Sequence, residues 1–186
     1  YNSMAAAACA TGLGVELRSV LEALAFASGV PGRMEVVETG KDYTVIIDFA
    51  HTPDGLENVL KAVGEIAKGR IITLFGCGGD RDRAKRPLMG EIATRLSDLV
   101  VVTSDNPRTE KPEAIIDDIL AGIKTNKKSV RVEVDRKKAI GLALSLAKEG
   151  DIVLLAGKGH ETTQTLADKT IEFDERKIVK EILANK

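Results

Sequence analysis

The spacing of hydrophobic residues changes character after about residue 31. Before that point, residues 15–28 place apolar side chains at helical intervals, and Gly29 and Pro31 follow as helix-ending residues. Residues 2–11 are rich in alanine and are also predicted to be helical. Beyond residue 31, short β-branched runs alternate with amphipathic segments, which predicts alternating strands and helices.

The second part of the chain therefore predicts an α/β fold. The predicted strands are 34–38, 43–48, 70–75, 98–103, 129–133 and 151–156. The predicted helices are 53–67, 87–97, 112–124, 136–149 and 174–184. Several strands are almost continuous apolar runs, as expected when both faces of a sheet are covered. We expect a Rossmann-like, mostly parallel sheet with helices on both faces, and a C-terminal β-hairpin that turns at Asp168 and Lys169.

The segment "GVPGR" at 29–33 is the predicted domain boundary. We divide the chain into a helical tail of another domain, residues 1–31, and an α/β domain, residues 32–186. The sequence begins with Tyr1 and not with methionine, so we expect a fragment of a longer protein or a processed product.

Composition narrows the classes of function. The chain has 186 residues, 44% hydrophobic and 30% charged, with a formal net charge of −1, which is typical of a soluble globular protein. Neither a nucleic-acid nor a membrane partner is expected from this balance, and no stretch is apolar for long enough to span a bilayer. Two cysteines, Cys9 and Cys77, fit a reducing compartment better than a disulfide framework.

Polar loops follow four of the predicted strands. Their sequences are "DFAHTPD", "GCGGDRDRAKRP", "SDNPRTEKP" and "GKGHETTQ", whereas the opposite connections "AKGR" and "AKEGD" are plain turns. The carboxyl ends of parallel strands meet at one edge of the sheet, where open α/β sheets bind their ligands. The sequence therefore predicts a ligand site at this edge.

The loop residues indicate the kind of ligand. Glycines allow close approach of the backbone, and N–H groups at helix starts favour anions. Four arginines offer forked donors for carboxylates or phosphates: Arg81, Arg83, Arg86 and Arg108. Three acids could accept from ammonium groups: Asp80, Asp105 and Glu161. A ligand with both signs of charge, such as an amino acid, fits this mixture better than a polyanion.

Each motif also has a simpler interpretation. The glycine-rich loop matches neither the dinucleotide fingerprint nor the Walker pattern. Its basic residues could form a solvated surface, and the Asp105–Pro107 segment could be an Asx-type turn. His51 and His160, with Cys77, come from three different loops, and no local ligand pair supports a metal site. Either histidine could act as an acid or base or as an orienting partner, and Cys77 is expected to be a small packed residue.

Five motifs together resemble one family. They are "GRMEV" at 32–36, "DFAHTPD" at 48–54, "FGCGGDRDRAKRPLMG" at 75–90, "SDNPR" at 104–108 and "AGKGHE" at 156–161. In this order and spacing they resemble the C-terminal part of the Mur ligases, over essentially the whole chain. "DNPR" resembles the signature of the branch that adds meso-diaminopimelate to UDP-MurNAc-L-Ala-D-Glu, in cytoplasmic peptidoglycan precursor synthesis.

The resemblance implies a division of labour. The C-terminal domain receives the amino acid and closes over a central ATPase domain, which would pack against this chain. ATP and Mg²⁺ convert the D-glutamate carboxyl to an acyl phosphate, which the amine of diaminopimelate attacks. The Walker loop, the magnesium ligands and a carbamylated lysine lie in the central domain, of which residues 1–31 would be the end. The resemblance thus implies no metal site and no catalytic residue here, with His51 as an accessory candidate, and no ligation by this chain alone.

The resemblance also assigns binding residues. Those implied to bind the amino acid are Arg81, Asp105, Asn106, Pro107, Arg108, Gly157 and Glu161. Among them, Arg81 and Arg108 would grip carboxylates with Asn106 alongside, and Gly157 and Glu161 would hold the far amino-acid centre. Those implied to contact ATP are Asn2, Arg33, Asp48 and His51, with Asp48 accepting from the ribose hydroxyls. Asn2 resembles an asparagine near the adenine, although Ala5 replaces the second asparagine of that motif.

Other functions stay open at this point. A related branch adds a different diamino acid such as L-lysine, which would offer Arg108 no second carboxylate. The chain could instead be a non-catalytic amino-acid-binding module, or a Rossmann domain that binds phosphate without preference for an amino acid.

Overall fold

The computed structural model describes residues 2–27, 29–124 and 129–184 of the chain. These residues form two compact units, Tyr1–Val30 and Pro31–Lys186. The first unit consists of helices α1 (Asn2–Gly12) and α2 (Leu17–Phe26). In α2 only Val20 is buried, so most apolar side chains of this unit are exposed. The predicted helix 15–28 ends earlier, because Ala27 is extended, and Ser28 lies outside the described residues.

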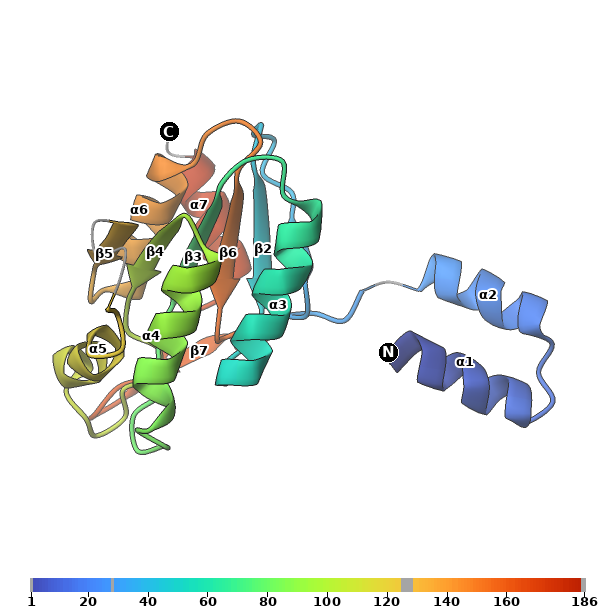
Figure 1. The fold of residues 1–186 in the computed structure, drawn as a ribbon, viewed down its shortest axis with the longest axis horizontal. Helices are drawn as coiled ribbons and strands as arrows, with labels where there is room; N and C mark the ends of the chain where they lie inside the picture. Colours follow the sequence, from blue (N-terminus) through green and yellow to red (C-terminus); the bar gives the residue numbers. More distant parts are fainter. Residues whose placement is uncertain (1, 28, 125–128, 185–186) are drawn as a thin grey trace. The chain divides into compact units, whose positions relative to one another are not determined.

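The second unit is built on a six-stranded sheet (Figure 1). Its strands are β1 (Glu35–Val37), β2 (Thr44–Asp48), β3 (Ile71–Phe75), β4 (Leu99–Val102), β5 (Val130–Val132) and β6 (Ile152–Ala156). The spatial order is β1-β2-β6-β3-β4-β5, and every pair is parallel except β1 with β2. The mostly parallel sheet predicted from the sequence is therefore confirmed, with one antiparallel strand at its edge.

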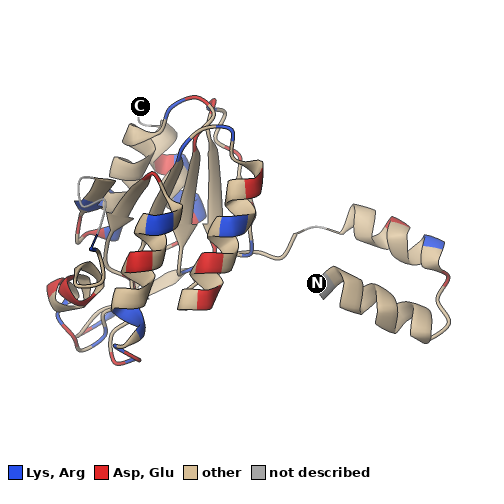
Figure 2. Ribbon diagram, viewed as in Figure 1, with Lys and Arg blue, Asp and Glu red and all other residues tan. Residues whose placement is uncertain are grey.

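Helices cover both faces of this sheet (Figure 1). On one face lie α3 (Pro53–Ile66), α4 (Lys85–Leu96) and α5 (Pro112–Leu120), and on the other α6 (Arg136–Leu146) and α7 (Glu175–Ala184). Side chains alternate between the two cores along each strand. In β6, Ile152 and Leu154 join the core under α3 and α4, whereas Val153 and Leu155 join the core under α6 and α7. The central strands carry almost no charged residues, which lie mainly in loops and on helices (Figure 2). None of the described helices is long and apolar enough to cross a membrane.

In the second unit, three helix boundaries differ from the prediction by two residues or more. Helix α4 begins at Lys85, two residues early. Helix α5 ends at Leu120 and not at 124. After Leu120, the N–H groups of Gly122 and Ile123 each donate to the carbonyl three residues earlier, and Gly122 packs against the backbone of Pro87. A Cβ on Gly122 would lie 1.9 Å from the Pro87 carbonyl oxygen, so a contact between two helices ends this one. Helix α6 ends at Leu146 because the next residue is extended.

The sheet topology brings the polar loops together. Strands β2, β6, β3 and β4 are parallel neighbours, so the loops that follow them leave from the same edge. The predicted hairpin, β7 (Thr163–Thr165) and β8 (Thr170–Glu172), follows β6 and turns at 166–169. It binds one of these loops directly, because the Arg108 N–H donates to the Thr165 carbonyl at 3.2 Å.

Candidate functional site

A pocket of about 360 Å³ lies at the carboxyl edge of the sheet. All four loops contribute to its lining: Phe49, His51, Thr52, Gly76, Cys77, Gly78, Arg81, Asp82, Lys85, Asp105, Asn106, Arg108, Gly157 and Glu161. Six of the seven residues predicted to bind an amino acid therefore share one pocket. Pro107, the seventh, is buried, does not line the pocket, and contacts Gly79 through its carbonyl group.

The glycine-rich loop is fixed to the "DNPR" loop through its backbone. The Gly79 N–H donates to the Asn106 carbonyl at 2.9 Å, and Arg108 Nη1 donates to the Gly79 carbonyl at 2.8 Å. A Cβ on Gly79 would lie 1.9 Å from the Pro107 oxygen, so only glycine fits here. Arg108 has a φ of 52°, in the left-handed region that non-glycine residues rarely adopt. This contact positions Arg108 and Arg81 in one pocket.

The structure separates the four arginines into two kinds. Arg86 is fully buried and binds Glu110 with both terminal nitrogens, at 2.9 and 2.7 Å, and Asp118 at 2.8 Å. The exposed Arg83 also binds Asp118. The Arg86 guanidinium lowers the pKa of Glu110 to about 2. The buried Arg86 therefore holds the loop together and is not available to a ligand, whereas the exposed Arg83 is already paired with a carboxylate.

The other two arginines bind only carbonyl groups. Arg81 donates to the Asp80 carbonyl at 3.1 Å and is exposed. Arg108 Nη1 donates to the carbonyls of Gly79 and Asn106, at 2.8 and 3.4 Å. Neither guanidinium forms a salt bridge in the described part of the chain, although Arg108 lies near enough to Asp80 to interact with its charge, so both can receive an anion from outside.

Acidic side chains lie on another side of the same pocket. Asn106 Nδ2 donates to Glu161 Oε2 at 2.9 Å, and Lys158 Nζ donates to the same oxygen at 3.1 Å. Asp105 is buried, and its Oδ1 accepts from the Asn106 N–H at 2.7 Å. Its Oδ2 accepts no hydrogen bond from the described residues and lies 3.8 Å from Arg136 Nη1. A Cβ on Gly157 would come within 2.9 Å of that oxygen, and its φ of 115° also requires glycine.

Two of the residues predicted to contact ATP, Arg33 and Asp48, lie next to Phe49 or its neighbours. Arg33 is exposed and lies over the Phe49 ring, 5.0 Å from its centroid. Asp48 is buried, and its two carboxylate oxygens accept the backbone N–H groups of Met34 and Ala50, each at 2.8 Å. The structure describes Asn2 only as the first residue of α1. The carboxylate of Asp48 thus fixes two loop segments, and its proposed contact with a ribose stays a prediction.

The histidines and Cys77 lie around the pocket without forming a metal cluster. His51 Nδ1 is 2.8 Å from the Phe49 carbonyl oxygen, and the rings of His51 and His160 pack against Phe49 at 4.6 and 5.1 Å. Burial raises the pKa of the Cys77 thiol to about 12, and its Sγ lies 3.6 Å from Met89 Sδ. Cys77 is therefore a packed residue, as predicted. Within the described ranges, no group of three or more histidine, cysteine or acidic side chains could hold a metal ion.

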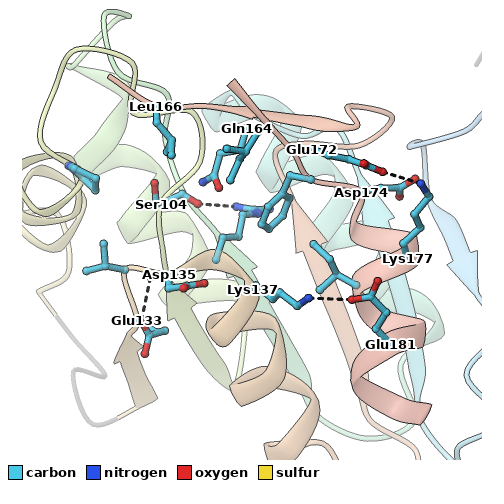
Figure 3. A pocket seen from close by; sticks show the side chains of 16 residues that line it. Ser104, Glu133, Asp135, Lys137, Gln164, Leu166, Glu172, Asp174, Lys177 and Glu181 are labelled. Carbon is cyan, nitrogen blue, oxygen red and sulfur yellow. Dashed lines mark hydrogen bonds and ion pairs between the residues drawn. The ribbon is translucent and has the colours of Figure 1, made fainter. Parts of the chain in front are cut away.

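A larger cavity of about 720 Å³ lies between the hairpin, α6 and α7 (Figure 3). It contains none of the residues predicted to bind the amino acid or ATP. Its lysines already have acidic partners, with Lys137 2.9 Å from Glu181 and Lys177 2.7 Å from Glu172 (Figure 3). The smaller pocket is the better candidate because Arg81 and Arg108 form no salt bridge within the described residues, and Asp105 Oδ2 accepts no hydrogen bond from them.

Several structural residues of the site had no signal in the sequence analysis. Lys158 lies inside a quoted motif, but nothing in the sequence places its ammonium group against Asn106. Glu110 and Asp118 bind Arg86 from 24 and 32 residues away. Arg136 binds Glu175 and the carbonyls of Ser104 and Ala156. These contacts depend on the strand order, which the sequence pattern did not specify.

Comparison with known proteins identifies related chains. Residues 32–159 match the family model described as Mur ligase, glutamate ligase domain. The chain is 53% identical over 187 residues to UDP-N-acetylmuramoyl-L-alanyl-D-glutamate–2,6-diaminopimelate ligase of Syntrophomonas wolfei, covering 100% of this chain and 38% of that protein. It is 56% identical over 185 residues to the ligase of the same name from Caldanaerobacter subterraneus, covering 99% and 38%. The chain thus spans less than half the length of these relatives.

Solved structures agree with this grouping. A structure with the same ligase name superposes with a TM-score of 0.79 at 38% identity, over 98% of this chain and 37% of that one. The UDP-N-acetylmuramate–alanine ligase of Thermotoga maritima has a TM-score of 0.67 at 22% identity, over 99% and 36%, and shares the fold.

Proposed function

This chain belongs to the Mur ligase family, and from that premise we propose that it is the amino-acid-binding domain of a ligase specific for meso-diaminopimelate. In the full-length protein, this domain would present the amine of diaminopimelate to UDP-MurNAc-L-Ala-D-Glu, and an amide bond would form in peptidoglycan precursor synthesis. The chain would pack on a central ATPase domain and act in the cytoplasm, where ATP and nucleotide substrates are found. Residues 1–31 would be the end of that central domain.

The observation that carries this proposal is the arrangement of charged side chains in the pocket. Arg81 and Arg108 form no salt bridge among the described residues, and Glu161, whose Oε2 is paired with Lys158, lies in the same pocket with an Oε1 that accepts no hydrogen bond from those residues. A ligand that carries carboxylates and an ammonium group satisfies both kinds of charge. Diaminopimelate has two amino-acid centres, so one amine can react while the other centre is held by Arg108 and Glu161.

The chain's own contribution to the reaction is positioning. Holding the amine in a fixed geometry near an activated carboxyl makes the encounter effectively intramolecular, which accelerates such reactions by large factors. ATP supplies the activation of that carboxyl when it is bound. Arg33, Asp48 and His51 lie around the Phe49 ring or bind its neighbours, and we propose that they contact the nucleotide, together with Asn2. Mg²⁺ would be held by the central domain, as the resemblance to the family implies.

Calorimetric titration of the full-length ligase tests the proposal. With ATP analogue and nucleotide substrate present, meso-diaminopimelate is compared with L-lysine, for the wild type, Arg108→Ala and the control Arg83→Ala. We expect a preference for diaminopimelate of about tenfold or more that disappears in Arg108→Ala, because an Arg–carboxylate contact is worth at least 1.4 kcal/mol. Arg83→Ala should keep the preference, because Arg83 binds Asp118.

Other outcomes of this titration would favour one of the alternative functions. Equal binding of both amino acids, or indifference to Arg108, would remove the diaminopimelate assignment in favour of a branch that adds another diamino acid. Binding without any turnover of the full-length protein would indicate a non-catalytic module.

A further inference from the structure

A fully buried lysine lies behind the candidate pocket. Lys158 follows β6, has a side chain that is 0% exposed, and does not line the pocket. Its Nζ lies 3.0 Å from Asn106 Oδ1 and 3.1 Å from Glu161 Oε2, and 5.9 Å from the centre of the Phe173 ring. A buried ammonium group is costly unless it is paired and hydrogen-bonded. Both of its hydrogen-bond partners are residues that we propose to bind the amino acid.

The contacts of Lys158 determine how the Asn106 amide is oriented. Asn106 Oδ1 accepts from Lys158 Nζ and also from the Thr165 N–H at 3.0 Å. With two donors fixed on the oxygen, the amide nitrogen must point the other way. It donates to Glu161 Oε2 at 2.9 Å. Without the lysine, the amide oxygen would lose one of the two contacts that define this orientation.

The same contacts determine which oxygen of Glu161 is free. Oε2 accepts from both Lys158 and Asn106, whereas Oε1 accepts no hydrogen bond from the described residues. The Glu161 side chain is 32% exposed and lines the pocket. An ammonium group that enters the pocket therefore meets Oε1, while a permanent cation holds Oε2 from the protein interior.

We propose that Lys158 is a positioning residue that orients Glu161 and Asn106 for recognition of the ammonium group of the incoming amino acid. This inference rests on the proposed function of the pocket. Lys158 acts through Glu161 and makes no contact with the ligand itself. An apolar side chain of similar length could fill the space against Phe173, but it would supply neither the donor to Asn106 nor the cation behind Glu161.

Steady-state kinetics of the full-length ligase with Lys158→Met tests this role. We expect the KM for diaminopimelate to rise by about tenfold, as for loss of a hydrogen bond to a charged group. We expect the KM values for ATP and the nucleotide substrate to stay within about twofold, because only the amino-acid pocket is affected. Lys137→Met is the matched control, since Lys137 is ion-paired with Glu181, is 56% exposed and lies outside this pocket. Lys158→Gln, which leaves no buried charge and keeps a donor, provides a second variant if the methionine variant does not fold.

A double-mutant cycle with Glu161→Gln separates positioning from a structural role. If Lys158 acts through Glu161, its replacement should change the KM by less than about twofold once Glu161 is already Gln, since the two effects are coupled. Additive effects, an unchanged KM in Lys158→Met, or an equal rise in the KM of all three substrates would overturn the proposal. A wild-type enzyme that uses L-lysine and rejects diaminopimelate would refute the proposed function instead. The same cycle run with L-lysine would then decide the role of Lys158, because that ligand also offers an ammonium group.

Discussion

Replacing Arg86 by methionine should destabilise the protein far more than the same change at Arg83. Both arginines bind Asp118, but Arg86 is 0% exposed and Arg83 is 66% exposed. Arg86 also binds Glu110 twice and donates to the Gly78 carbonyl at 3.2 Å. Breaking a buried ion pair by removing one partner costs about 3–5 kcal/mol, whereas exposed pairs contribute about 0–1 kcal/mol.

The geometry places Arg86→Met near the lower end of that range. The Glu110 and Asp118 side chains are 22% and 29% exposed, so water can reach both carboxylates once the guanidinium is gone. We therefore expect a loss of about 3 kcal/mol for Arg86→Met and about 0.5 kcal/mol for Arg83→Met. With a urea m-value of about 2 kcal/mol per M, the unfolding midpoint should fall by about 1.5 M and about 0.25 M, respectively. Equal shifts at unchanged m would refute the idea that burial of Arg86 holds the loop.

Three further predictions concern the loops and the core. The buried Arg86 lowers the pKa of Glu110 from 4.5 to about 2. The stabilising contribution of ionised Glu110 is therefore complete above pH 4.5 and is lost as the pH falls towards 2. Glu110→Gln should flatten this part of an acid unfolding profile. Gly79→Ala should weaken diaminopimelate binding by about tenfold in calorimetry, because the added Cβ would lie 1.9 Å from the Pro107 carbonyl oxygen. Gly64→Ala, where an added Cβ finds open space inside a helix, should instead raise the free energy of unfolding by about 0.5–1 kcal/mol. At pH 8, iodoacetamide should modify the exposed Cys9 and spare the buried Cys77, as read by mass spectrometry, and modification of Cys77 in the folded protein would contradict its packed position.

Local patterns were sufficient to predict the elements of the sheet and the edge at which the polar loops gather around a pocket. β6 and β3 are continuous apolar runs, and their predicted limits agree with the observed strands to within one residue. Long-range contacts explain what the patterns missed. Helix α5 ends where Gly122 meets Pro87, and β1 pairs antiparallel to β2 at the sheet edge. Neither contact changes the spacing of hydrophobic residues along the chain, so the pattern could not predict it.

The candidate site shows the same limit. Four arginines in two loops were equivalent in the sequence, and only the partners supplied by α5 and its preceding loop distinguish Arg83 and Arg86 from Arg81 and Arg108. Residue types could thus indicate a ligand with both signs of charge but could not tell which side-chain charges in the loops are already neutralised. That distinction requires the packing of α4 against α5.

The ion pairs that these side chains already form predict whether the carboxylate or the ammonium group of the ligand contributes more to affinity. Glu161 already has a cation 3.1 Å away, in Lys158, whereas Arg81 and Arg108 bind only carbonyl groups. A ligand carboxylate would therefore form the first salt bridge of either arginine, while a ligand ammonium would be the second cation at Glu161. Losing a carboxylate should cost more affinity than losing an ammonium group.

Two analogues of diaminopimelate test this asymmetry in the full-length ligase. L-Lysine lacks one carboxylate, and 2-aminopimelate lacks one ammonium group. In competition calorimetry against diaminopimelate, 2-aminopimelate should bind about tenfold more tightly than L-lysine, which corresponds to about 1.4 kcal/mol. In Lys158→Met, Glu161 would lose its orientation for the ammonium group, so L-lysine should weaken more than 2-aminopimelate and the gap between the analogues should widen. A tighter complex with L-lysine in the wild type would mean that the buried cation does not set the balance of charge in the pocket.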